Sequence, residues 1–376
     1  MASLTAKARA PSIVLAAGGT GGHLFPAFAL AQELARRAIG VDLVTDQRGD
    51  RYGADFPARA IHQLPSATLK GRSPLAAAKT GMTLLRGVAA AFGLFRRLQP
   101  AAVVGFGGYP SFAPVVAARL LGLPTLLHEQ NAVLGRANRL LAGHVTAVAT
   151  SFEKTKFVAE RGAKVHHIGN PVRDQVLQWA DRAYREPSRE GAFHLLVFGG
   201  SQGARYFSEL LPAALALLAP AVRARLIVVQ QCRNEDLAGV RSAYLAQAVA
   251  AELATFFPNL PEEMAKAHLV IGRSGASTVA ELAVLGRPAI LVPLPHAIDN
   301  DQRLNAIRLA ESGGAWCLEQ GDLSPERLAS TLNDLMTAPE RLLGAAAAAK
   351  RQGRPDAVGR LADLVEELIG NRRHDA

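Results

Sequence analysis

The fold of this chain is decided by one stretch, Ile13-Val14-Leu15-Ala16-Ala17-Gly18-Gly19-Thr20-Gly21-Gly22-His23. An apolar strand runs into four glycines and one hydroxyl, and an Ala- and Leu-rich helical segment follows over residues 25–37. Glycine lets the backbone approach a bulky anion, and the helix directs its free N–H groups and the positive end of its dipole toward that anion. The stretch therefore predicts a phosphate-binding loop.

The same pattern occurs twice more. A strand at 101–104 precedes the glycine-rich residues 105–111, and a strand at 195–198 precedes residues 199–205. The copies lie in both halves of the chain, which indicates two phosphate-handling domains that face one another. No frame supplies the G-x-G-x-x-G fingerprint of dinucleotide-binding proteins, and no G-K-[ST] of a Walker A motif occurs. The ligand is therefore neither a dinucleotide nor ATP in its usual cradle.

Strands and helices alternate along most of the chain. Wholly apolar strands joined by helices predict an α/β protein with two doubly wound, Rossmann-like parallel sheets and a ligand cleft between the domains. We expect strands at 13–17, 41–45, 101–104, 125–128, 145–150, 194–198, 226–231, 269–272 and 289–293. The expected domain plan is a disordered tail at 1–10, an N-terminal domain at 11–170, a linker at 171–190, a C-terminal domain at 191–350 and a C-terminal helix at 351–376.

Composition excludes several classes of protein. The 376 residues are 49% hydrophobic, which excludes an intrinsically disordered chain. The two cysteines, Cys232 and Cys317, have no metal-type spacing, as is usual in a reducing cytosol. The apolar runs are too short for a signal peptide or a membrane-spanning helix. We therefore expect a soluble protein.

The net charge of +10 is unevenly distributed. No carboxylate occurs between Asp55 and Glu129, whereas eight Lys or Arg residues do. Within this window, residues 74–98 interleave large apolar side chains with cations and predict one or two helices. Such a segment can lie on an anionic bilayer, or it can be an ordinary core helix with a solvated basic face. The few aromatic residues are not spaced as stacking platforms for nucleic acid.

The second half carries a hydroxyl-rich loop after the strand at 269–272. Residues 273–281 begin a helix whose first turn can hold a pyrophosphate, and Glu281 can accept hydrogen bonds from a ribose or can serve as a capping residue. Farther along, residues 293–296 follow a strand and residues 299–302 open a helix, so their polar groups are placed to contact sugar hydroxyls.

Taken together, these motifs resemble the MurG family of bacterial glycosyltransferases. The resemblance extends from Ile13 to the C-terminal helix and keeps the order of eight motifs, at residues 18–23, 70–72, 105–109, 128–131, 169–173, 199–205, 273–281 and 301–302. It implies a two-domain GT-B fold. It also implies transfer of N-acetylglucosamine (GlcNAc) from UDP-GlcNAc to the 4-hydroxyl of undecaprenyl-pyrophosphoryl-N-acetylmuramoyl-pentapeptide.

The resemblance also implies the site residues. The donor UDP-GlcNAc would be held mainly by the C-terminal domain, with Phe257 offering its backbone to the uracil. The donor residues so implied are Thr20, Gly21, Gly22, Asn131, Arg173, Ser201, Phe257, Ala276, Ser277, Thr278, Val279, Ala280, Glu281 and Gln302. The acceptor pyrophosphate would be held by Lys70, Arg72, Gly107, Gly108 and Tyr109. Around residues 295–299 the chain departs from the family, with Pro295 in place of a Gln and one extra residue.

Inverting transfer needs a base for the acceptor hydroxyl. His23 lies at the mouth of the first glycine loop, and an imidazole can take a proton near neutral pH; alternatively it only hydrogen-bonds the loop or a phosphate. Glu129 is the rival base, or it is a carboxylate that orders its loop. His128 is expected to be a buried core histidine. Helix N-termini and Arg173 would stabilise the departing UDP.

No cofactor and no metal are expected, because no Asp-x-Asp pair follows a strand at the donor phosphates. The lipid acceptor favours peripheral attachment of residues 74–97 to the cytoplasmic face of the plasma membrane, with anionic lipid and cell-wall synthesis proteins as further partners. Three alternatives remain open: a related transferase acting on another lipid such as a diacylglycerol, a UDP-sugar epimerase, and a membrane scaffold that binds UDP-sugar without turnover.

Overall fold

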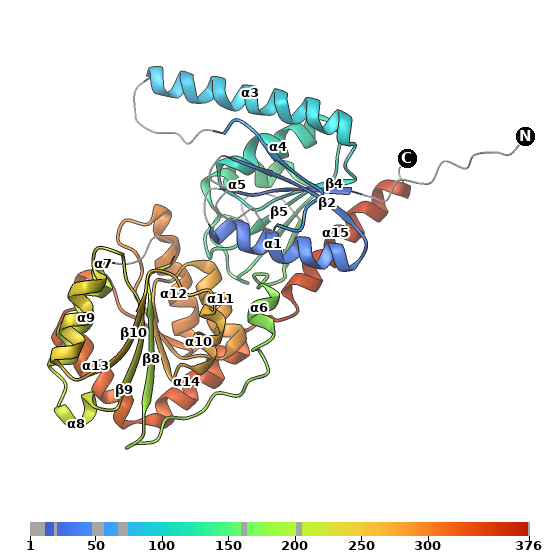
Figure 1. The fold of residues 1–376 in the computed structure, drawn as a ribbon. Coiled ribbons are helices and arrows are strands. Elements are labelled where there is room, and N and C mark those ends of the chain that lie inside the picture. Colours follow the sequence, from blue (N-terminus) through green and yellow to red (C-terminus); the bar gives the residue numbers. More distant parts are fainter. Residues whose placement is uncertain are drawn as a thin grey trace, which may run out of the picture. The chain divides into compact units, whose positions relative to one another are not determined.

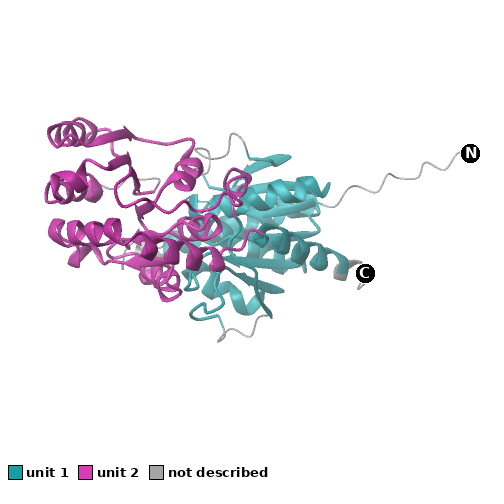
Figure 2. Cartoon of the chain, turned by 90° about the horizontal axis from the view of Figure 1, so that it is seen from below, with its two compact units in different colours: residues 1–171, 356–376 teal, residues 172–355 magenta. Residues whose placement is uncertain are grey.

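The computed structural model describes residues 12–18, 21–46, 56–66, 74–158, 164–200 and 205–374 (Figure 1). The tail expected at 1–10 and four predicted ligand residues, Thr20, Lys70, Arg72 and Ser201, lie outside the described residues. The chain divides into two compact units, residues 1–171 with 356–376 (unit 1) and residues 172–355 (unit 2), which Figure 2 colours separately.

Unit 1 is built on a seven-stranded parallel sheet in the order β3-β2-β1-β4-β5-β6-β7. Its strands are β1 (Ser12–Ala16), β2 (Gly40–Thr45), β3 (Ala60–Gln63), β4 (Ala102–Gly105), β5 (Thr125–Glu129), β6 (Ala147–Thr150) and β7 (Lys164–His167). Its helices are α1 (Gly21–Arg36), α3 (Pro74–Leu98), α4 (Tyr109–Leu120), α5 (Arg136–Leu141), the short 3-10 helix η2 (Ala142–His144) and α15 (Ala357–His374).

Unit 2 contains a six-stranded parallel sheet in the order β10-β9-β8-β11-β12-β13. Its strands are β8 (Phe193–Phe198), β9 (Leu226–Gln231), β10 (Ala250–Ala254), β11 (Leu269–Gly272), β12 (Ala289–Leu291) and β13 (Ala315–Cys317). Its helices are α6 (Asp174–Leu177), α7 (Arg205–Ala216), α8 (Pro220–Arg223), α9 (Leu237–Ala246), α10 (Leu260–Lys266), α11 (Ala276–Leu285), η4 (Ile298–Asn300), α12 (Asp301–Glu311), η5 (Gln320–Asp322), α13 (Pro325–Thr337) and α14 (Pro339–Gln352).

The central strands are buried along their whole length, because helices cover both faces of each sheet. Every residue of β1, β4, β5, β6, β11 and β12 is buried. The prediction of two doubly wound parallel sheets is confirmed. In each unit all strands run the same way, so the loops that leave their carboxyl ends gather at one edge of the sheet.

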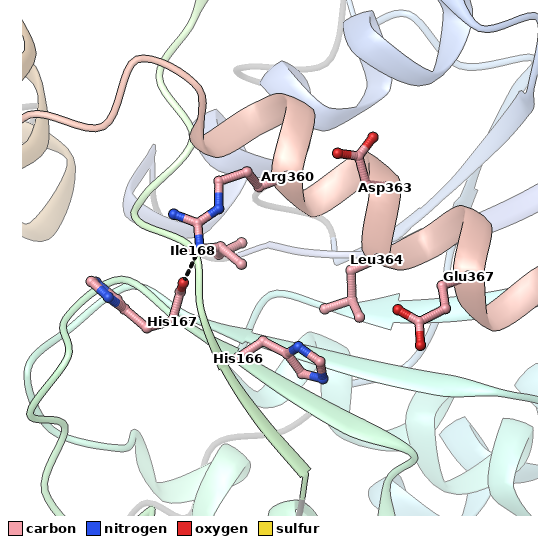
Figure 3. Close-up of a pocket in the computed structure, with 7 residues that line it drawn as sticks. All are labelled: His166, His167, Ile168, Arg360, Asp363, Leu364 and Glu367. Carbon is pink, nitrogen blue, oxygen red and sulfur yellow. Dashed lines mark hydrogen bonds between the residues drawn. The ribbon is translucent and has the colours of Figure 1, made fainter.

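The C-terminal helix α15 belongs to unit 1. Its Leu361 and Val365 share a core with Leu30 of α1, and the Arg37 guanidinium lies 2.6 Å from Asp363 and 3.2 Å from Glu366. Helix α15 also borders a groove beside the edge strand β7, where Arg360 donates a hydrogen bond to the His167 carbonyl at 2.7 Å (Figure 3). Of the linker expected at residues 171–190, Pro171 clusters with unit 1 and residues 172–190 cluster with unit 2.

Residues 74–98 form a single helix, α3, that lies along α4 (Figure 1). Its inner face packs Ala91, Leu94 and Phe95 against the α4 side of the sheet. Its outer face exposes 55% of Met82 and 66% of Leu85 beside the exposed cations Lys79, Arg86, Arg96 and Arg97. In the part of the chain that the structure describes, no helix is both long and apolar enough to cross a membrane.

Arg287 is the largest fully buried side chain of the described residues and holds three segments of unit 2 together. Its guanidinium donates to the carbonyls of Ala265, Leu285, Gly286 and Arg182 at 2.7–3.2 Å. Burial lowers its pKa to about 10, so it stays charged at neutral pH. The cation thereby ties residues 172–190 to the ends of α10 and α11.

We expect Arg287→Met to lower the free energy of unfolding by about 3–5 kcal/mol, because it leaves several buried carbonyls without a donor. Arg287→Lys should lower the free energy of unfolding by less than Arg287→Met does, since lysine keeps the charge but lacks the planar guanidinium with its several donors. Urea unfolding followed by circular dichroism measures both. Arg189→Met is the matched control, because Arg189 is exposed and forms an ion pair with the likewise exposed Glu340. Equal midpoints for Arg287→Met and Arg189→Met would contradict the role of Arg287.

Candidate active site

In unit 1, the predicted base and two predicted acceptor glycines meet at the carboxyl edge of the sheet. Helix α1 begins at Gly21, so Gly21, Gly22 and His23 form its first turn. The His23 Nδ1 atom lies 2.9 Å from Oε1 of Gln130. A Cβ atom placed on Gly108 would lie 3.3 Å from Cδ2 of the His23 ring, and one on Gly107 would lie 3.4 Å from its Cε1.

Gly107 and Gly108 both have positive φ angles, 86° and 70°. Side chains are strained in this left-handed region, and here a side chain would also press on the imidazole of His23. The loop after β4 therefore brings bare backbone to the histidine ring. Tyr109 begins α4 immediately afterwards, so the three predicted acceptor residues of this loop stay together.

Glu129, at the end of β5, is 1% exposed and accepts four hydrogen bonds. Its Oε1 accepts from the backbone N–H and the side-chain amide of Asn131, at 3.0 and 3.2 Å. Its Oε2 accepts from the backbone N–H of Gly135 and the side-chain amide of Asn138, both at 2.8 Å. The geometry is that of a carboxylate that orders the loop over residues 129–138, the second of the two roles predicted for it.

His128 is fully buried, as predicted for a core histidine. Its Nε2 lies 3.2 Å from the Gly169 carbonyl, and its ring packs at 5.6 Å from that of Phe106. Burial lowers the pKa of His128 to about 4, so the imidazole is neutral at physiological pH. Gln130, between His128 and His23 in space, is also buried and was not among the predicted site residues.

In unit 2, side-chain amides join the loops that leave neighbouring strands. Gln231, at the end of β9, accepts from the backbone N–H of Gly199 at 3.3 Å and donates to the Thr255 carbonyl at 3.0 Å. Next to Thr255, Phe256 is 72% exposed whereas Phe257 is 6% exposed. The Phe257 side chain thus belongs to the core, which leaves its backbone as the part able to meet a ligand.

Helix α11 presents an open N-terminus at the same edge. Its N-cap is Gly275, and no side chain caps its first turn. The Ser277 hydroxyl is buried and has no hydrogen-bond partner among the described residues. Free N–H groups, an unpaired hydroxyl and the helix dipole together form an anion-binding end. Ala276, Ser277 and Thr278, three of the predicted donor residues, form the first turn at this end.

Glu281 does not cap α11, and that alternative prediction is wrong. The carboxylate is buried one and a half turns into the helix, where Nη2 of Arg173 lies 3.4 Å from its Oε1. Burial raises the pKa of Glu281, and Arg173 opposes this shift. Val279 and Ala280 lie between on the same helix, with Val279 buried. The pair brings together two predicted donor residues from distant parts of the sequence.

Gln302, in the first turn of α12, is fixed by two contacts with the preceding loops. Its Oε1 accepts from the Leu294 N–H at 3.0 Å, and its backbone carbonyl accepts from the Ser274 hydroxyl at 2.8 Å. Arg273 holds the preceding loop through the carbonyls of Val292 and Pro293, both at 3.1 Å. With Oε1 engaged, the side-chain amide keeps the donor capacity of Nε2, because none of the hydrogen bonds of the described residues uses that group.

The loop between β12 and α12 is strained. His296, Asp299 and Asn300 all have positive φ angles of 54–60°, although none is glycine. Such strain persists where the surrounding structure fixes it, commonly at ligand sites. This is the segment that departs from the family pattern. Among the described residues, no group of three or more His, Cys, Asp or Glu side chains is placed to hold a metal ion.

Comparison with known proteins identifies the family. Residues 13–150 match the glycosyltransferase family 28 N-terminal domain, and residues 194–361 match its C-terminal domain. The UDP-N-acetylglucosamine--N-acetylmuramyl-(pentapeptide) pyrophosphoryl-undecaprenol N-acetylglucosamine transferase of Methylobacterium sp. (strain 4-46) is 56% identical over 95% of this chain and 96% of its own. The chain belongs to the MurG family. It is a GT-B glycosyltransferase, as the resemblance implied.

Further relatives agree. The transferase of the same name from Brucella suis is 53% identical over 96% of this chain and 95% of its own. The crystal structure of Acinetobacter baumannii MurG is 29% identical, with a TM-score of 0.78 over 95% of this chain and 99% of that one. A UDP-N-acetylglucosamine 2-epimerase from Listeria monocytogenes, 14% identical with a TM-score of 0.65 over 94% of this chain and 95% of that one, shares the fold alone.

Gln130, Arg273 and Ser274 lie within the motifs of the sequence but were assigned no role there, although they hold predicted site residues in place. Gln130 contacts His23, and Arg273 and Ser274 fix the loops around Gln302. Two of the three carried a usable signal, because Gln130 and Arg273 each follow the last residue of a buried strand. Polar residues at that position lie at the ligand-binding edge of a parallel sheet.

We expect Glu129→Gln to lower the free energy of unfolding by about 1–3 kcal/mol, because its amide would turn an N–H group toward donors that now face an oxygen. Thermal unfolding without ligand measures this loss. Glu153→Gln, at an exposed site in the same unit, is the control and should leave the midpoint unchanged. A Glu129→Gln protein of unchanged stability that lacks all transferase activity would instead identify Glu129 as the base.

Proposed function

We propose that this protein transfers GlcNAc from UDP-GlcNAc to the 4-hydroxyl of undecaprenyl-pyrophosphoryl-N-acetylmuramoyl-pentapeptide, with inversion at the anomeric carbon. The relatives named for this reaction are 53–56% identical over 95–96% of the chain. The observation that carries the proposal is the position of His23, in the first turn of α1 and against the two glycines of the β4–α4 loop.

His23 is the proposed general base. Its Nδ1 is engaged by Gln130, and among the described residues no group bonds with its Nε2. That nitrogen can accept the proton of the acceptor 4-hydroxyl as the oxygen attacks the anomeric carbon. Lys70, Arg72, Gly107, Gly108 and Tyr109 would hold the acceptor pyrophosphate. The bare backbone beside the ring leaves room for the sugar that carries the hydroxyl.

Unit 2 would hold the donor. The pyrophosphate would bind at the N-terminus of α11 with the hydroxyls of Ser277 and Ser201, where N–H groups and the helix dipole stabilise the charge that develops on the leaving UDP. Glu281, with Oε1 engaged by Arg173, would accept from the ribose. Phe257 would offer its backbone to uracil, and Nε2 of Gln302 would contact the sugar. Thr20, Gly21, Gly22 and Asn131 of unit 1 would reach the sugar end.

This set of ligands contains no carboxylate pair that faces the donor phosphates. Glu281 is the carboxylate on α11, and it pairs with Arg173. We therefore propose that N–H groups, hydroxyls and Arg173 neutralise the pyrophosphate without a divalent cation. Transfer should then persist in a chelator.

We further propose that the outer face of α3 binds the cytoplasmic face of the plasma membrane. Met82 and Leu85 can enter the headgroup region while Lys79, Arg86, Arg96 and Arg97 meet anionic lipid. The inner face of α3 is already used in the core, so the outer face is free to bind a surface. Attachment there would hold unit 1 at the source of its lipid acceptor.

The reaction is tested by release of UDP from UDP-GlcNAc, with and without a short-chain lipid-linked muramoyl-pentapeptide, in EDTA. We expect release that depends on the acceptor and survives the chelator. His23→Gln should lower kcat by about 10²–10⁴-fold while UDP binding is retained. His144→Gln, at an exposed site of unit 1, is the matched control. UDP-sugar binding without release would favour another acceptor or a binding protein without turnover.

Membrane attachment is tested by sedimentation with vesicles that contain phosphatidylglycerol. We expect binding that weakens as salt is raised and is lost in the Met82→Glu, Leu85→Glu double variant. The matched control changes two leucines of unit 2 that are as exposed, Leu217→Glu and Leu245→Glu. Both double variants should keep full activity on a water-soluble acceptor. Equal loss of vesicle binding in the two would place the membrane contact elsewhere.

A further inference from the structure

Gln130 lies in a buried site that permits one orientation of its side-chain amide. One end of the amide is 3.0 Å from the backbone carbonyl of His128 and 2.9 Å from the Nδ1 of the same residue. A carbonyl oxygen only accepts hydrogen bonds, so this end must be the NH2 group. The opposite end, which faces His23, is therefore the carbonyl oxygen.

His128 supports this orientation through its own tautomer. Its Nε2 lies 3.2 Å from the carbonyl of Gly169, which only accepts, so Nε2 carries the proton of the neutral ring. The lone pair is then on Nδ1, where it accepts from Gln130. The low pKa of His128, caused by its burial, keeps the ring neutral at physiological pH. The two side chains thus form one consistent network.

The reversed network is excluded by two contacts between acceptors. With the amide turned over, its oxygen would face the His128 carbonyl oxygen at 3.0 Å. His128 would then have to carry its proton on Nδ1, and the lone pair of its Nε2 would face the Gly169 carbonyl at 3.2 Å. Gln130 and His128 are both buried, so water cannot relieve either contact.

The Nδ1 of His23 lies 2.9 Å from the carbonyl oxygen of Gln130, and it must donate to that oxygen. We infer that Gln130 is a positioning residue that holds neutral His23 in the Nδ1–H tautomer and so presents the unprotonated Nε2 to the acceptor hydroxyl. The inference rests on the proposed function of His23 as the base. It adds a specific cause for the state of that base, a glutamine fixed by the carbonyl and the imidazole of His128.

Ring packing fixes the direction of Nε2. A Cβ atom on Gly108 would lie 3.3 Å from Cδ2 and 3.4 Å from Nε2 of His23, and one on Gly107 would lie 3.5 Å from Nδ1. Both ring edges therefore border the glycine loop. A ring turned over about its Cβ–Cγ bond would place a carbon against the Gln130 oxygen and lose the hydrogen bond. The amide and the glycines together define which nitrogen meets the substrate.

The tautomer is measured directly in the full-length protein, without substrate, by NMR of nitrogen-15-labelled histidine at neutral pH. The signal of His23 is assigned by its loss in His23→Gln. We expect the protonated nitrogen of neutral His23 to be Nδ1. In Gln130→Met, which removes the acceptor at similar volume, we expect a shift toward the Nε2–H tautomer that free histidine favours. A wild-type His23 protonated on Nε2, or a tautomer unchanged in Gln130→Met, would overturn the inference.

Glu129→Gln is the control, because it disturbs the same loop and leaves the amide of Gln130 in place. His23 should keep its Nδ1 proton in this variant. Equal loss of that tautomer in Glu129→Gln and Gln130→Met would attribute the effect to loop order and would also overturn the role of Gln130.

Kinetics then connect the tautomer to catalysis. We expect Gln130→Met to lower kcat by about 10–100-fold with little change in the KM for UDP-GlcNAc, because a base in the wrong tautomer loses part of the gain of general base catalysis. An unchanged kcat despite a changed tautomer would overturn the catalytic part of the inference. Absence of transfer by the wild-type protein would refute the proposed function instead, and the NMR result would still decide the tautomer.

Discussion

The structure depends on one constraint, the burial of parallel sheets on both faces. A parallel strand that is covered above and below can place polar groups only where it ends, and all strands of a unit end at the same edge. The residues of the two candidate sites accordingly follow strand ends: His23 after β1, Gly107 after β4, Gln130 after β5, Ser277 after β11 and Gln302 after β12. Chemistry that is scattered over 280 positions of sequence, from 23 to 302, is collected by topology at one edge in each unit.

The sequence was sufficient to predict the central strands of each sheet but not its edge strands. All nine strands predicted from apolar runs occur in the structure, with ends shifted by up to two residues. The four strands it did not predict, β3, β7, β10 and β13, are the four edge strands. An edge strand has one neighbour and is partly solvated, so its sequence need not be apolar, as in Ala60-Ile61-His62-Gln63 and Lys164-Val165-His166-His167. A hydrophobic pattern reveals a strand only where the strand is buried, and these edge strands are the least buried strands of each sheet.

The candidate site shows a similar division. Glycine loops and helix starts could be predicted, because close approach of backbone to an anion restricts the residue types that fit. The two roles of Glu129 could not be separated, since what decides between them is where Asn131, Gly135 and Asn138 direct their N–H groups. The Gln130 contact with His23 was not predictable either, because it joins a loop to a helix start 107 residues away. Side-chain contacts across loops follow from the tertiary structure and leave no local pattern.

At the carboxyl edge of each sheet, the polar residues differ in how many of their hydrogen-bonding groups are already used within the protein. Glu129 uses four hydrogen bonds on its own loop, and Arg273 spends its guanidinium on the Val292 and Pro293 carbonyls and on Gln320. A buried group so satisfied has no capacity left for a substrate and stabilises one loop conformation. The Ser277 hydroxyl, the Nε2 of His23 and the Nε2 of Gln302 keep theirs among the described residues. The polar residues of the strand ends thus fall into two sets: one uses its hydrogen bonds to fix the loops, and the other keeps donors or acceptors available at the same edge.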